Sequence, residues 1–140
     1  MSYALPLWGG TYRKTVEPVI KYMKFAIRVM SRTNKWHPSS QLFANFNCLP
    51  FKDLYVFKVL KLFFRMSGTF RKVPEGGATR SSKALTYYVP HPNRTAFQKS
   101  FSYIGPYFFN SLPPCCRMAN KRGFANKILE VIKKGNHIFL

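Results

Sequence analysis

The stretch from Gln98 to Pro114, QKSFSYIGPYFFNSLPP, constrains the fold of this chain more than any other part of the sequence. Five of its residues are aromatic, and its only charge is Lys99 near one edge. A segment this apolar is an aggregation hazard unless other elements cover it. We therefore expect a core segment against which the rest of the chain packs. The alternative is that some of its rings form a platform on which nucleic-acid bases stack.

The spacing of apolar residues predicts a mainly α fold. Ser67–Lys83, rich in glycine and basic residues, predicts an irregular exposed loop. Leu85–Val89 has strand character, but no partner strand is evident. We expect a small helical domain of about four to five helices, with this basic loop and at most one short strand pair. The predicted helices are Thr15–Met30, Ser39–Phe46, Phe51–Met66, Ser102–Leu112 and Asn120–Lys134.

The segment Thr15–Met30 has the clearest amphipathic pattern. Pro18 falls in its first turn, where a missing N–H is tolerated. The basic side consists of Lys14, Lys21, Lys24, Arg28 and Arg32, of which Lys14 precedes the segment and Arg32 follows it. The apolar side consists of Val16, Val19, Ile20, Met23, Ile27 and Met30.

Phe51–Met66 is apolar around most of its circumference and carries a narrow basic stripe of Lys58, Lys61 and Arg65. A helix of this kind is buried with one ridge exposed, which makes it the best partner for the aromatic stretch.

Three local features add detail to the predicted helices. Ser39 or Ser40 is expected to cap the second helix. Gly105-Pro106 is expected to kink the fourth, and Gly135 is a suitable stop for the last.

The charge balance points to a polyanionic partner. Lys and Arg number 23 against four acids, which gives a formal net charge of +19. Self-repulsion at this charge destabilises a compact state unless something neutralises it. Nucleic acid is the favoured counterpart and an anionic membrane the second, although Phe51–Met66 is apolar on too many sides to lie flat at an interface.

The residues needed for catalysis are missing. Two-metal chemistry requires several converging carboxylates, whereas Glu17, Asp53, Glu75 and Glu130 are scattered along the chain. A zinc site from Cys115-Cys116 with Cys48, His37 or His91 lacks any zinc-ligand spacing. We predict no catalytic residue, no metal and no cofactor.

Cysteine usage and hydropathy suggest a compartment. Three cysteines, two of them adjacent, make a poor disulfide framework and favour a reducing environment. The first ten residues lack a secretory pattern, and no apolar run approaches the roughly 20 residues of a membrane span. We expect a soluble intracellular protein of the cytoplasm or nucleus.

Because no catalytic residue is predicted and the chain is strongly basic, nucleic-acid binding is the function that the composition favours. Phosphate contacts of this kind give affinity without sequence preference. The aromatic residues near the cations are Tyr12, Tyr22, Trp36, Tyr87 and Tyr88. The candidate contact residues are Lys14, Lys21, Lys24, Arg28, Arg32, Lys58, Lys61, Arg65, Arg71, Lys72 and Arg80.

The order of several short motifs resembles a known family. Tyr3–Gly9 (YALPLWG) followed by Phe25–Met30 (FAIRVM) resembles the Y-G-x-x-x-W-G … Q-K-x-A-I-R-x-I pattern that follows the polymerase palm in reverse transcriptases of jockey-like non-LTR retrotransposons. Ala4 stands where that family usually has Gly, and Met23-Lys24 where Gln-Lys is common. The likeness extends from Tyr3 to Lys134 through Leu42-Phe43, Leu49-Pro50, Leu54–Phe64, Thr79-Arg80, Ser100–Pro106 and Phe109–Pro113.

This resemblance implies a C-terminal piece of a polymerase, without fingers or palm. It implies one domain over residues 1–140, with a thumb-like helical part (1–66), a loop or linker (67–93), and the aromatic segment with the last helix (94–140). Because no Asp-Asp pair occurs, polymerase activity is not implied. The implied partners are RNA or DNA and the rest of a reverse transcriptase. By analogy with a thumb helix, Lys21, Lys24 and Arg28 would contact phosphates, with Arg32 and Lys35 at the edge.

Two other hypotheses stay open. The chain could be a degenerate transposon remnant with no selected partner, basic because its parent bound nucleic acid. It could also be a basic amphipathic protein that binds anionic membrane surfaces.

Overall fold

The prediction of a mainly α fold is confirmed by a computed structural model, which describes residues 4–73, 86–90 and 93–133. Within these ranges the chain forms eight α-helices and one short 3-10 helix. Their bounds are α1 Leu5–Trp8, α2 Arg13–Met30, α3 Ser39–Asn45, α4 Phe51–Arg65, η1 Ser67–Thr69, α5 Thr95–Gln98, α6 Phe101–Ser111, α7 Pro114–Arg117 and α8 Lys121–Lys133. The five predicted helices correspond to α2, α3, α4, α6 and α8, and the rest are single turns.

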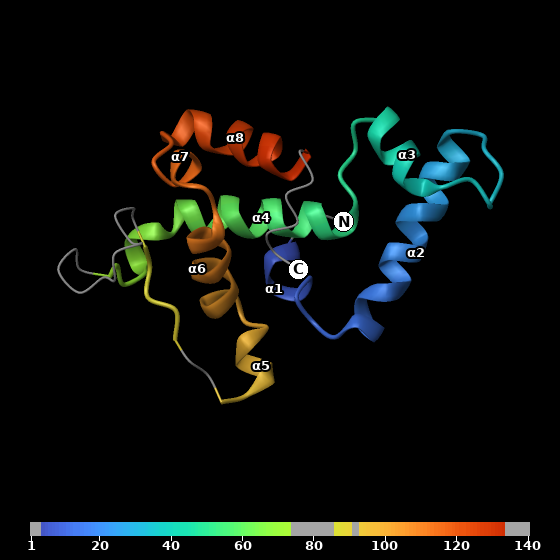
Figure 1. Ribbon diagram of the computed structural model, residues 1–140. Coiled ribbons are helices and arrows are strands. Elements are labelled where there is room, and N and C mark those ends of the chain that lie inside the picture. Colours follow the sequence, from blue (N-terminus) through green and yellow to red (C-terminus); the bar gives the residue numbers. More distant parts are fainter. Residues whose placement is uncertain (1–3, 74–85, 91–92, 134–140) are drawn as a thin grey trace.

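Helix α4 lies at the centre of the molecule, with α1, α6 and α8 packed against it (Figure 1). Its side chains Val59, Leu60 and Phe63 are fully buried. A helix that is apolar on most sides can bury its surface only by taking several partners. The main core therefore draws on residues from Leu5 to Ile128.

The aromatic stretch packs against α4, as the sequence predicted. The rings of Phe63 and Phe109 lie 5.3 Å apart, and Tyr55 meets Phe108 edge-on at 6.3 Å. Phe108 and Phe109 are buried, so these two rings cannot form a platform for bases. Helix α6 runs without a break through Gly105 and Pro106.

Two glycines allow close approaches to α4. A Cβ at Gly105 would lie 2.7 Å from Cδ2 of Phe63, so α6 can reach its position on α4 only because this side chain is missing. A Cβ at Gly9 would lie 2.5 Å from Cδ2 of Tyr55. Both glycines belong to the motifs that carry the family resemblance.

An extended segment at Tyr87 is held on two sides. The described strand pairing is one isolated antiparallel bridge between Lys72 and Tyr87. On the other side, the Tyr87 N–H donates to Oδ1 of Asn110 at 2.9 Å, and Nδ2 of Asn110 donates to the Tyr87 carbonyl at 2.7 Å. The side-chain amide thus acts as a second partner strand, one residue long.

Helices α2 and α3 form a hairpin (Arg13–Asn45) that extends from the body of the molecule (Figure 1). Val16 belongs to the main core, whereas Ile27 packs with Leu42 and Phe43 in a small separate cluster. Met23 contacts both clusters. The hairpin therefore has a core of its own, linked to the main one near Met23.

The helix starts differ from the predictions. Helix α2 begins at Arg13, so Pro18 lies inside the helix and not in its first turn. Because proline has no backbone N–H, the hydrogen bond from residue 18 to the carbonyl of Lys14 is missing. The expected cap from Ser39 or Ser40 is wrong: Pro38 precedes the first helical residue, Ser39, and no side-chain cap is present. Gly135 lies outside the described residues.

Candidate nucleic-acid interface

The predicted cations of α2 are mostly solvent-exposed. Lys14, Lys21 and Lys24 are exposed. Nζ of Lys21 lies 3.5 Å from the carboxylate of Glu17, one turn earlier in the helix, and forms an ion pair with it. An exposed pair of this kind contributes little and leaves the lysine accessible to another anion.

Arg28 has a structural contact within the hairpin. It is half-buried, and its Nε donates to the carbonyl of His37 at 3.1 Å. This bond ties the end of α2 to the loop that leads into α3. A role in phosphate binding would have to use the other nitrogens of the guanidinium.

Arg32 lies beyond the helix and has a left-handed backbone, with φ of 51°. The N–H of Arg32 bonds to the carbonyl of Val29, and the N–H of Thr33 to that of Arg28, each at 3.1 Å. These two bonds form a Schellman motif, which usually places glycine at this position. The Arg32 side chain is exposed at the end of the hairpin.

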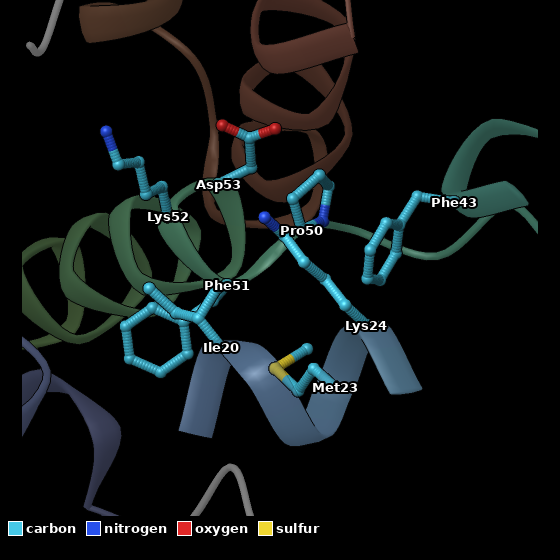
Figure 2. Close-up of a pocket in the computed structure, with 8 residues that line it drawn as sticks. All are labelled: Ile20, Met23, Lys24, Phe43, Pro50, Phe51, Lys52 and Asp53. Carbon is cyan, nitrogen blue, oxygen red and sulfur yellow. The ribbon is translucent and has the colours of Figure 1, made fainter. Parts of the chain in front are cut away.

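Lys24 points in a direction that the helical pattern does not reveal. Figure 2 shows it reaching from α2 toward the start of α4, near Pro50, beside a cavity of about 320 Å³. The apolar wall of this cavity includes Ile20, Met23 and Phe51. Lys21 and Lys24 are both exposed, but Lys24 also lines this cavity, whereas Lys21 does not.

The remaining described candidates form a second group. Lys58, Lys61 and Arg65 lie on the solvent side of α4, and Arg71 and Lys72 follow η1. The end of α4 that leads into η1 and the α2–α3 hairpin lie at opposite ends of the molecule (Figure 1). The predicted residues thus form two basic regions and not one patch. Arg80 lies outside the described residues.

The aromatic candidates divide by exposure. Trp36 is 81% exposed, and Nζ of Lys35 lies 5.1 Å from the centre of its ring. Tyr12, Tyr22 and Tyr88 are also exposed. Tyr87 is 5% exposed and packs edge-on against Phe63 and Phe109, so its proposal as a residue beside bound nucleic acid is wrong.

The sequence reasoning missed an outer apolar face on α2. This face consists of four exposed residues, Tyr22, Phe25, Val29 and Met30, and the side chain of Phe25 is 65% exposed. Met30, which the sequence placed on the apolar side of the helix, is 66% exposed. The spacing of Tyr22, Phe25 and Val29 at i, i+3 and i+7 could have identified this face, but the stronger pattern of the buried side concealed it.

Other chemistry is sparse in the part of the chain that the structure describes. No group of three or more His, Cys, Asp or Glu residues lies close enough there to hold a metal ion. Cys48 and Cys115 are exposed and Cys116 is buried, all as free thiols. Burial raises the pKa of the Cys116 thiol. None of the described helices combines the length and apolar character needed to cross a bilayer.

The arrangement defines a small, mainly α, strongly basic fold with two exposed cationic regions. Comparison of the chain with protein-family models, curated proteins and solved structures found no match.

Proposed function

We propose that this chain is a non-catalytic nucleic-acid-binding fragment that contacts RNA or DNA phosphates through the α2–α3 hairpin, without sequence preference. The observation that carries this proposal is the exposed cationic side of α2 on a chain of net charge +19. Lys14, Lys21 and Arg32 extend into solvent along or just beyond this helix. Phosphate binding releases the counterions that such a surface attracts.

We further propose that the chain corresponds to the region after the palm of a jockey-like reverse transcriptase. Support comes from the physical roles of the motif residues. Ala4, at the position where the family usually has Gly, adopts φ of 52°, a conformation that glycine tolerates best. Gly9 and Gly105 permit close approaches to α4, and Asn110 holds the backbone of Tyr87. These motif residues act in folding, which leaves binding to the basic surfaces.

The positions of the acids support a non-catalytic role. Of the four acids, Glu17, Asp53 and Glu130 lie on three different helices, α2, α4 and α8, and Glu75 lies outside the described residues. A two-metal centre needs carboxylates that meet at one point.

The test is the salt dependence of binding to an RNA–DNA hybrid, measured by fluorescence anisotropy. Replacing Lys21, Lys24 and Arg28 together by Gln should weaken binding and flatten the plot of log affinity against log salt. The slope should fall by about 0.9 for each phosphate that the variant no longer neutralises. An unchanged slope would show that this side of α2 does not bind phosphates.

A matched control removes three exposed charges elsewhere: Arg94, Arg122 and Lys127. If this variant lowers the slope as much as the α2 variant, net charge and not the hairpin determines binding. A third variant, with Lys58, Lys61 and Arg65 replaced, measures the contribution of the second basic region. If the wild-type protein binds no hybrid at physiological salt, the hypothesis of a remnant without a selected partner is favoured.

A second candidate function is binding to an anionic membrane surface. The outer apolar face of α2 favours it, since exposed Tyr22, Phe25 and Val29 beside lysines resemble an interfacial helix. Flotation with vesicles that contain anionic lipid separates the two functions. Phe25→Ser should abolish flotation under this second hypothesis and leave hybrid binding largely unchanged under the first.

A further inference from the structure

A second cavity lies beside the one in Figure 2 and shares Ile20, Phe51 and Lys52 with it. Its volume is also about 320 Å³, at the small end of the range for ligand sites. Its apolar wall includes Val16 and Ile20 from α2, Phe51 and Val56 from α4, and Phe108 from α6. Because the two cavities share three lining residues, they adjoin each other between α2 and the start of α4, and we call the pair the groove; its first cavity is also lined by Lys24 and Asp53.

The charged side chains that line this second cavity are all basic, whereas Asp53 lines the first cavity. Arg13, Lys52 and Lys99 line it, and no Asp or Glu does. Arg13 and Lys52 are exposed at its edge, and Nζ of Lys99 lies 4.1 Å from the centre of the Tyr12 ring. Three cations around an apolar space repel one another, and an anion placed among them relieves that repulsion.

One wall of the cavity is closely packed around Tyr55. The Tyr55 ring lies against Gly9 and Gly10, so closely that a Cβ on Gly10 would lie 2.4 Å from the Tyr55 hydroxyl oxygen. This hydroxyl is covered and has no hydrogen-bond partner. The Tyr55 ring therefore packs closely against the α1–α2 connection in this wall of the cavity, which also includes residues of α4 and α6.

We propose that this groove binds an amphipathic anion, an alkyl chain that carries a carboxylate or a phosphate. The chain would lie on Ile20 and Phe51, and the head group among Arg13, Lys52 and Lys99. The head-group residues Arg13, Lys52 and Lys99 are not among the proposed phosphate contacts of nucleic acid, although Lys24, which is one of those contacts, lines the neighbouring first cavity.

The test is isothermal titration calorimetry with the full chain and dodecanoate, below its micelle concentration and at about 150 mM salt, where nonspecific charge effects are screened. Dodecyl phosphate in a parallel titration distinguishes the two head groups. Two ligand controls separate the contributions: acetate has the charge without the chain, and dodecyltrimethylammonium has the chain with the opposite charge. Dodecanoate should bind measurably, and both controls at least tenfold more weakly.

Two variants locate the ligand. Replacing Lys52 and Lys99 by Gln should weaken dodecanoate binding about tenfold, on the scale of two partly exposed charge interactions. The matched control, Lys61 and Arg65 replaced by Gln on the same helix α4 but outside the groove, should change it less than twofold. Ile20→Trp fills the shared wall without changing the charge, and should weaken binding at least tenfold while hybrid binding persists.

Equal binding of dodecanoate and acetate, or of dodecanoate and the alkylammonium, would overturn the proposal. Equal weakening by the two double variants would overturn it as well. Binding to anionic vesicles without binding to monomeric dodecanoate would assign the effect to the outer face of α2 instead. Should Ile20→Trp lose its helical circular dichroism, the two surface double variants still decide the outcome.

Discussion

At the scale of single residues, Ala4 has a backbone conformation that favours glycine, at a position where the family that the chain resembles usually has Gly. Ala4 precedes α1 with φ of 52°, and it is one of three non-glycine residues with positive φ in the described part of the chain. The others, Arg32 and Asn47, follow the ends of α2 and α3. An L-residue in this conformation carries a strain of about 1–2 kcal/mol that glycine does not.

We therefore expect Ala4→Gly to stabilise the protein. The relief of strain should exceed the extra backbone entropy that glycine loses on folding, for a net gain of roughly 0.5–1 kcal/mol. The measurement is the free energy of unfolding by urea. Ala26→Gly, at an exposed position inside α2, is the matched control and should lower stability by about 1 kcal/mol. If both changes destabilise equally, Ala4 is not strained.

At the scale of helices, the packing of α6 on α4 depends on the absence of one side chain. Gly105 is buried within α6 and faces the fully buried ring of Phe63. Ala is the better helix former by about 1 kcal/mol, so intrinsic propensity and packing act in opposite directions at this residue.

Packing should dominate in Gly105→Ala. With a Cβ only 2.7 Å from the Phe63 ring, we expect a loss of about 1–3 kcal/mol of stability from overpacking. Gly123→Ala in α8 is the control, because a Cβ there would meet nothing within 4 Å; it should be neutral or stabilise by up to about 1 kcal/mol. Thermal unfolding of both variants tests this, and a stable Gly105→Ala protein would show that α6 can move away from α4.

The helices also show which features the sequence could predict. The five longer helices have apolar residues at regular spacing, and this spacing predicted them. For α4, the sequence also predicted which helix packs against it, α6. The single-turn helices α1, α5 and α7 have four residues each, too few for a periodic signal. The direction of Lys24, the bond from Arg28 to His37 and the exposure of Met30 depend on neighbours that are distant or absent, so helical spacing alone could not predict them.

At the scale of the whole molecule, the fold has two unequal cores. The main cluster joins α1, α4, α6 and α8 with Val16 from the start of α2, whereas the buried members of the hairpin cluster, among the described residues, are Ile27, Leu42 and Phe43. Few buried contacts mean a low free energy of local opening. The proposed phosphate-binding surface is thus carried by the part of the molecule that has the smaller core.

Native-state hydrogen exchange should reveal this difference. We expect amides of α3 and the C-terminal half of α2 to exchange faster than those of α4. Ile27→Ala should accelerate exchange in the hairpin and leave α4 protected, because the cavity it creates lies outside the main core. Ile128→Ala, in the main core, should instead reduce protection throughout. Equal loss of protection in α4 for both variants would contradict two separate cores.

The contact between Asn110 and Tyr87 has a consequence for association between chains. The N–H and carbonyl of Tyr87, which a strand from another molecule would need, are both bonded to the Asn110 amide. On the opposite side, the bridge to Lys72 is flanked by bonds from Val73 to Thr86 and from Tyr88 to Arg71. Natural sheets often protect open edges with lysine, proline or bulges against the addition of a foreign strand. Here one carboxamide, supplied by a helix, closes that edge at Tyr87.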